Sequence, residues 1–129
     1  MPARRKKILV IDEKGFCRIC SALLKVAGYG METLTYTKSN DLSCTFSRDN
    51  IGLIITSYPY SHLLLHQARK SNIPFIILTD NIDKNLMSTL NGLSNSYCMI
   101  KPIDYKKFRT LVVDIMSGSC TARRGYAIV

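Results

Sequence analysis

The sequence predicts an α/β protein with a parallel β-sheet between two layers of helices. Short apolar runs of strand length alternate along the chain with longer segments whose apolar residues recur at helical spacing. Residues 51–56 and 74–79 are apolar at almost every position, which is typical of strands that are covered on both faces. Because five strand–helix pairs follow one another in strict alternation, the strands are expected to run parallel, with helices on both faces of the sheet.

In the first half of the chain, residues 8–11 form an apolar run, and residues 14–27 place their apolar side chains at helical spacing. Gly28 and Gly30 follow this helix, and glycine is the usual residue just beyond a helix C-terminus. Residues 31–37 alternate and are rich in threonine and tyrosine, as a strand should be. Residues 41–48 are predicted as a weak helix because they contain few good helix formers.

The second half of the chain continues the alternation. It divides into a strand over 51–56, a helix over 61–70, a strand over 74–79, a helix over 83–93, a strand over 96–100 and a helix over 104–116. Asp83 and Asp104 begin the last two helices and are predicted as their N-caps. Right-handed crossovers leave few topologies for five such units. We therefore expect a flavodoxin-like (βα)5 three-layer sandwich with the strand order 2-1-3-4-5, the common one at this size.

A chain of 129 residues is long enough for one domain with a full core. We expect that domain over residues 7–117, with a basic N-terminal arm over 1–6 and a flexible, small and basic C-terminal tail over 118–129. No apolar run approaches the roughly 18 residues that a membrane span needs. The basic start of the chain leads into a short strand and not into a signal-peptide core, so the sequence predicts a cytoplasmic protein without a membrane partner.

The net charge is +9, and the positive residues cluster only at 4–7, 106–107 and 123–124. No recognition motif for nucleic acid accompanies this charge, so a solvated surface is the favoured interpretation. A nucleic-acid-binding module that uses Arg4, Arg5, Lys6 and Lys7 is the alternative. The chain has five cysteines, and an odd number without an export signal indicates free thiols in a reducing compartment.

Polar residues follow the predicted strands where the strands end. Asp12 and Glu13 follow the first strand, Ser57 the third, and Lys101 the fifth. Ligands and chemistry collect at the carboxyl ends of the strands in a parallel α/β sheet. Two acids, a third carboxylate and a lysine at that edge would make a magnesium-assisted phosphoryl site. The chain offers a hydroxyl at the third position, so the sequence predicts a scaffold with a damaged site.

Over about residues 6–117 the chain resembles the receiver domain of bacterial response regulators, the phosphorelay modules of two-component systems. The segment 7–13, Lys-Ile-Leu-Val-Ile-Asp-Glu, resembles the opening strand of that family with its acidic pair. The segment 52–58, Gly-Leu-Ile-Ile-Thr-Ser-Tyr, resembles the strand that normally ends in the phospho-accepting aspartate, which implies that Ser57 stands in its place. The resemblance also implies that Thr79 is the switch hydroxyl, that Lys101 is the site lysine, and that the Pro102 peptide bond is cis.

The departures from the family pattern concern the phosphorylation site. Ser57 supplies neither the charge that a magnesium ligand needs nor, without an adjacent base, useful nucleophilicity. The connection after Ser57 is shorter than the usual loop that helps to form the metal site. Cys98 stands where an aromatic switch residue is common, and Tyr97, one position earlier, should point to the opposite face. We expect Asp12 and Glu13 to hold magnesium at best weakly, with Lys101 as their buried ion-pair partner.

The sequence thus predicts a pseudo-receiver: a non-enzymatic signalling module without a cofactor that acts by binding another signalling protein. The expected contact face comprises the fourth helix, fifth strand and fifth helix, and carries Tyr97, Lys106, Lys107 and Arg109. A homodimer through the same face is a further expectation.

Two alternatives remain open at this point. A thiol–disulfide protein could use Cys17 and Cys20, which form a C-x-x-C motif near a helix start, although Cys20 falls on the apolar helix face. A receiver with residual phosphoryl or magnesium binding is the other alternative. His62 and His66 have metal-compatible helical spacing, but no further ligand accompanies them, so helix packing is favoured.

Overall fold

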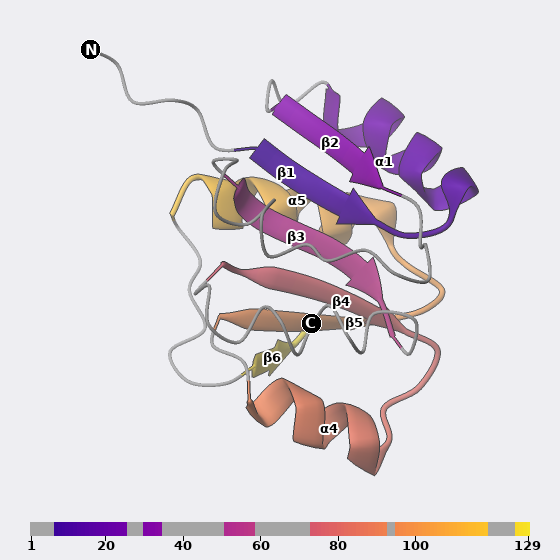
Figure 1. Cartoon of the computed structure of the whole chain (residues 1–129), viewed down its shortest axis with the longest axis vertical. Coiled ribbons are helices and arrows are strands. Elements are labelled where there is room, and N and C mark those ends of the chain that lie inside the picture. Colours follow the sequence, from indigo (N-terminus) through magenta and orange to yellow (C-terminus); the bar gives the residue numbers. More distant parts are fainter. Residues whose placement is uncertain (1–6, 26–29, 35–50, 59–72, 93–94, 119–125) are drawn as a thin grey trace.

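The computed structural model describes residues 7–25, 30–34, 51–58, 73–92, 95–118 and 126–129. Its centre is a parallel sheet with the strand order β2-β1-β3-β4-β5-β6 (Figure 1). The strands are β1 (Lys7–Ile11), β2 (Gly30–Leu34), β3 (Ile51–Ser57), β4 (Phe75–Thr79), β5 (Ser96–Ile100) and β6 (Tyr126–Ile128). The predicted order 2-1-3-4-5 is confirmed for the first five strands, and a sixth strand extends it.

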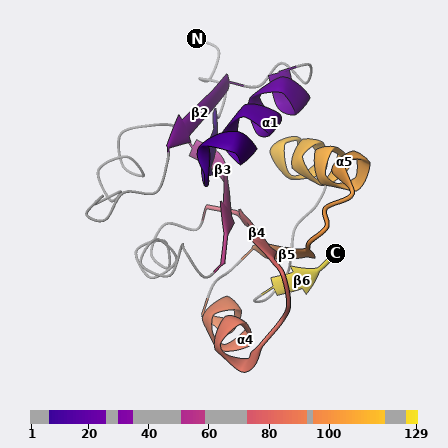
Figure 2. The same ribbon diagram turned by 90° about the vertical axis from the view of Figure 1, so that its right-hand side faces the viewer.

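Helices cover both faces of this sheet, which confirms the three-layer architecture. Helices α1 (Lys14–Lys25) and α5 (Tyr105–Met116) lie side by side on one face, and α4 (Lys84–Asn91) lies on the other (Figure 2). Asp83 and Asp104 are N-caps, as predicted, because their carboxylates accept hydrogen bonds from backbone N–H groups in the first turns of α4 and α5. The helices expected over residues 41–48 and 61–70 lie outside the described residues.

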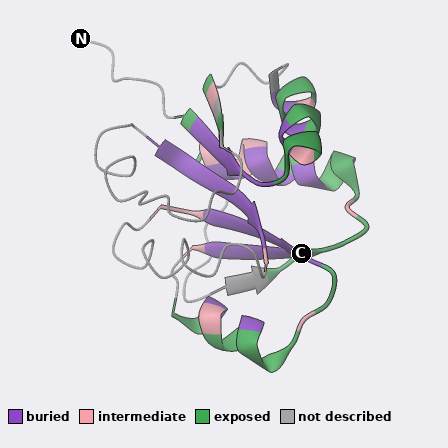
Figure 3. Ribbon diagram, turned by 45° about the vertical axis from the view of Figure 1, so that its right-hand side comes forward, coloured by how far each residue is buried: buried purple, intermediate pink, exposed green. Residues whose placement is uncertain are grey.

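The core is divided by the sheet into two apolar layers. Ile8 and Val10 of β1 pack on the side of α1 and α5, whereas Leu9 and Ile11 pack on the side of α4. This is the period-2 alternation of a strand that is covered on both faces. The central strands are accordingly buried along their length while the helices expose their outer faces (Figure 3). No helix in the described segments combines the length and apolar character needed to cross a bilayer.

The C-terminal segment corrects one expectation. Residues 118–129 were expected to be a flexible tail, but Tyr126–Ile128 form β6, which pairs in parallel with β5 from Ser96↔Tyr126 to Cys98↔Ile128. The N–H of Val129 then donates a hydrogen bond to the carbonyl of Cys98 at 2.9 Å. The physical reason is that the outer edge of β5 offers unpaired backbone groups, and an uncharged segment rich in strand formers satisfies them. The arm expected over residues 1–6 lies outside the described residues.

Candidate functional site

The sheet brings the predicted strand-end residues to one edge. Ser57 and Thr79 are the last residues of β3 and β4, while Asp12 and Lys101 directly follow β1 and β5. These four strands are consecutive neighbours and run in the same direction. Their carboxyl ends therefore meet along a single edge, where parallel α/β proteins place their sites.

Asp12 and Ser57 contact each other directly at this edge. The Ser57 hydroxyl donates a hydrogen bond to Oδ2 of Asp12 at 2.6 Å, and the N–H of Glu13 donates one to Oδ1 at 2.7 Å. Both side chains are buried, with 4% of Asp12 and 2% of Ser57 exposed. A short O–H···O⁻ bond to a carboxylate is among the stronger hydrogen bonds in proteins. Each oxygen of the Asp12 carboxylate thus has a neutral donor from the protein itself.

The other two residues of the expected site take part in local backbone structure. Thr79 is buried, and its hydroxyl donates a hydrogen bond to the carbonyl of Asn81 at 2.6 Å. The side chain of Glu13 is exposed, and its carbonyl accepts the N–H of Cys17 at 3.0 Å at the start of α1. Thr79 is therefore held by the turn after β4, and Glu13 faces solvent beside the buried pair.

Lys101 departs from the expectation of a buried ion-pair partner. Its side chain is exposed, and within the described residues no ion pair joins it to Asp12 or Glu13. The physical reason is that Asp12 is already satisfied by two neutral donors, while an ammonium group is strongly hydrated and costly to bury. The backbone N–H of Lys101 bonds the carbonyl of Thr79 at 2.7 Å, and the Lys101–Pro102 peptide bond is cis, the geometry that the resemblance implies.

The donor set at this edge does not fit a magnesium ion. Mg²⁺ requires near-octahedral oxygen ligation and is usually held by carboxylates together with phosphate. Here one buried carboxylate is engaged by Ser57 and Glu13, the neighbouring position on β3 carries a neutral hydroxyl, and the second acid is exposed. Across the described residues, no group of three histidine, cysteine or acidic side chains comes together as a cation site.

The C-x-x-C motif lies in the core of the protein. Cys20 is fully buried, and its burial raises the pKa of the thiol to about 12. Burial also raises the pKa of Cys17, whose Sγ donates to the carbonyl of Asp12 at 3.5 Å. A nucleophilic thiol needs a lowered pKa and access to its substrate. Neither cysteine has these properties, which argues against the thiol–disulfide alternative.

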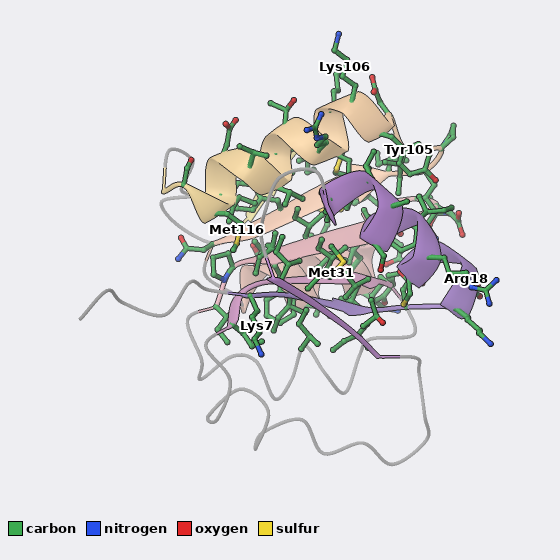
Figure 4. The ribbon with its side chains drawn as sticks, turned by 90° about the horizontal axis from the view of Figure 1, so that it is seen from above. Lys7, Arg18, Met31, Tyr105, Lys106 and Met116 are labelled. Atoms are coloured by element: carbon green, nitrogen blue, oxygen red, sulfur yellow. The ribbon has the colours of Figure 1, made fainter. Side chains whose placement is uncertain are left out.

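The expected contact face is corrected at one residue. Tyr97 is 3% exposed and packs in the layer beneath α1 and α5, because it points to the opposite side of β5 from Cys98. It therefore does not contribute to a contact surface. Lys106, Lys107 and Arg109 are exposed on α5, and the side chain of Lys106 extends away from the sheet (Figure 4).

Sequence reasoning missed a groove between α1 and α5. It has a volume of about 560 Å³ and is lined by Leu23, Tyr105, Lys106, Arg109, Thr110, Val113 and Asp114. The sequence analysis had singled out the basic residues Lys106 and Arg109. The apolar part of the lining, Leu23 and Val113, comes together only through the packing of α1 against α5. The sequence pattern does not predict that Leu23 lies beside the α5 side chains, because the two helices are distant in the chain.

Comparison with known proteins finds similarity in structure. No protein-family model matches the chain, and no curated protein matches its sequence. A signal receiver domain of a putative LuxO repressor protein from Vibrio parahaemolyticus superposes with a TM-score of 0.71 at 16% identity, over 90% of this chain and 93% of the other. A CheY-like receiver domain protein from Methanospirillum hungatei superposes with a TM-score of 0.70 at 14% sequence identity, over 90% of this chain and 97% of the other.

A signal receiver domain of a two-component histidine kinase from Clostridium thermocellum gives a TM-score of 0.66 at 20% identity, over 88% of this chain and 98% of the other. These receivers are therefore matched over almost their whole length. The strand order, the helices on both faces and the polar strand ends agree with this likeness. The chain has the CheY-like fold of response-regulator receiver domains.

Proposed function

We propose that this protein is a signalling module with a receiver fold that takes no phosphate on aspartate and acts by contact with another protein. The observation that carries the proposal is the buried hydrogen bond between Ser57 and Asp12, at 2.6 Å. A hydroxyl stands at the end of β3, where the resemblance to receivers places the phospho-accepting carboxylate. The one buried acid of the site is engaged by that hydroxyl.

The chemistry of phosphoryl transfer supports this proposal. An aspartate can attack a phosphoryl group as a carboxylate, and it also helps to hold the cation that neutralises the phosphoryl charge. Ser57 provides no negative charge, and with 2% of its surface exposed it is poorly placed to meet a donor. We propose accordingly that the protein uses neither a resident magnesium ion nor another cofactor.

The fixed position of Thr79 fits a module without a phosphoryl-driven switch. A ligand shifts a conformational equilibrium only through a difference in its interactions with the two states. The Thr79 hydroxyl donates a hydrogen bond to the carbonyl of Asn81 in the turn after β4, which holds it in place. We propose that the module rests in one conformation, and that its binding surface is available without phosphorylation.

The surface of α5 supports an acidic signalling partner. Lys106, Lys107 and Arg109 are exposed within about one turn of this helix, and the whole chain has a net charge of +9. Complementary charge steers encounter and helps to select partners. The described cysteines Cys17, Cys20 and Cys98 form no disulfides, which fits a reducing compartment such as the cytoplasm.

Intact-mass spectrometry after incubation with a small acyl phosphate and magnesium tests the proposal. We expect no gain of the mass of one phosphate, in either the wild type or Ser57→Ala. A hydroxyl held by a carboxylate is also the arrangement of a nucleophile and its base, so phosphorylation of Ser57 itself is the rival outcome. A stable gain in the wild type that is lost in Ser57→Ala would establish that rival and overturn the proposal.

A further inference from the structure

Strand β6 leaves one side of the sheet open. The N–H of Val129 bonds the carbonyl of Cys98, so Val129 directs its backbone donor towards β5. Successive residues of a strand direct their backbone groups alternately to the two sides. The N–H and C=O groups of Tyr126 and Ile128 therefore face away from β5. In the described part of the chain, β6 is the last strand of the sheet, and no strand pairs with that side.

This open edge lacks the usual protection against pairing with another chain. Natural edge strands carry lysine, proline, inward-pointing charges or a bulge that prevents strand addition. Residues 126–129, Tyr-Ala-Ile-Val, contain no charged side chain and no proline. Ile128 and Val129 leave 52% and 48% of their surface exposed. Among the residues that the structure describes, the edge therefore combines backbone groups that no strand pairs with and exposed apolar side chains.

Exposed apolar side chains continue from this edge onto its neighbours. Met87 on α4 and Ile100 at the end of β5 are 41% and 45% exposed, and both elements flank β6 (Figure 2). The large apolar residues exposed in the described segments are Ile19, Met87, Ile100, Tyr105, Ile128 and Val129. Ile19 and Tyr105 lie on α1 and α5, away from this edge, whereas the other four lie on β6 and the elements beside it. Such a concentration marks an interaction surface more than isolated exposed residues do.

We infer that this edge is a homodimer interface, in which β6 of one copy pairs antiparallel with β6 of a second copy across a twofold axis. The two sheets would join into one continuous sheet, with the outward groups of Tyr126 and Ile128 making the new hydrogen bonds. A twofold interface uses the same patch on both subunits, and two identical antiparallel strands meet this condition.

Because residues 126–129 have no charged side chain, this edge has nothing with which to attract an oppositely charged partner. Two copies each with a net charge of +9 repel through most of their surface. The basic side chains of α5 cannot face their own copies without repulsion, whereas the side chains of residues 126–129 carry no charge. This interface differs from the dimer expected from the sequence, through the fourth helix, fifth strand and fifth helix, because β6 pairs with the edge of β5.

Sedimentation equilibrium of the full chain tests the inference, with the protein from about 10 µM to about 1 mM to cover weak association. We expect the weight-average mass to rise from 14.6 kDa towards twice that value. Ile128→Lys introduces a charge at the edge, and Ile128→Pro removes an outward N–H without touching the Val129 bond. Both should remain monomeric at concentrations where the wild type dimerises. Ile19→Lys changes a similarly exposed residue on α1 and should dimerise like the wild type.

The salt dependence gives an independent result. Because the copies repel, raising the salt from about 50 mM to about 500 mM should strengthen the dimer by screening that repulsion. Near-ultraviolet circular dichroism shows whether each variant keeps its fold. A wild type that stays monomeric, a dimer that survives both Ile128 variants in folded form, or a dimer weakened by salt would each overturn the inference. None of these outcomes depends on phosphate uptake, so failure here is distinguishable from failure of the proposed function.

Discussion

Ser57 and Asp12 are 45 residues apart in the chain, and the pairing of β1 with β3 joins them. The sequence predicted this meeting because both residues follow apolar runs, and parallel strands end at one edge. It did not predict the position of the Lys101 ammonium group. A side chain with four carbons has many rotamers, and its charged end gains more from water than from an acid whose oxygens are already bonded.

The Ser57–Asp12 bond should contribute measurably to stability. Ser57→Ala removes the donor and leaves Oδ2 of the buried Asp12 without that partner, which costs about 1–3 kcal/mol. Urea unfolding at pH 7 measures this change. Thr89→Ala is the matched control, because its hydroxyl bonds the carbonyl of Asn85 on the exposed surface of α4. It should change stability by no more than about 0.5 kcal/mol. Equal effects of the two substitutions would contradict a stabilising role for the bond.

Helix α1 shows how element-scale packing determines cysteine chemistry. The apolar spacing of the sequence correctly placed Cys20 on the core face of this helix. Cys17, one turn earlier, contacts the backbone of Asp12. The sequence alone could not exclude a redox role for these cysteines, because a C-x-x-C pattern near a helix start does not show whether its thiols face solvent or the core. In the structure both cysteine side chains are buried, so they face the core.

We expect Cys17 and Cys20 to react slowly with a thiol reagent in the folded protein at pH 8. The raised pKa values keep both thiols protonated at this pH, since only the thiolate reacts, and burial limits access. Peptide mapping by mass spectrometry after timed alkylation follows each cysteine separately. The same protein in denaturant is the control, and both residues should be labelled rapidly there. Fast native labelling of both would support the thiol–disulfide alternative.

Strand β6 shows the element-scale limit of prediction from the sequence. The five predicted strands are present, and residues 96–100 match β5 residue for residue. β6 has three residues, which is too short for a periodicity to stand out from a basic tail. Its tyrosine, isoleucine and valine are strand formers. This weak preference produces a strand only because the edge of β5 offers backbone groups for pairing. That edge exists only once the sheet has assembled.

At the scale of the whole molecule, the receiver fold does not depend on the residues that follow its strands. Likeness to solved receivers extends over about nine-tenths of the chain at 14–20% identity. The core that supports this fold lies in the two apolar layers, and none of the strand-end residues belongs to them. These strand-end residues can therefore be substituted without loss of the architecture, which allows a further carboxylate to be introduced at the end of β3.

Ser57→Asp should make the stability of the whole protein depend on magnesium. The introduced carboxylate would lie beside Asp12, and like charges at this distance disfavour ionisation and destabilise the fold without a cation. Magnesium that binds only the folded state should then raise stability. With a Kd of about 1 mM, about 10 mM Mg²⁺ would add roughly 1.4 kcal/mol. Thermal unfolding across a magnesium titration measures the effect. The wild type and Ser57→Asn, which has the same size without the charge, should respond little. If all three proteins respond equally, Ser57 does not lie at the acidic edge in solution, and its placement at the end of β3 beside Asp12 is wrong.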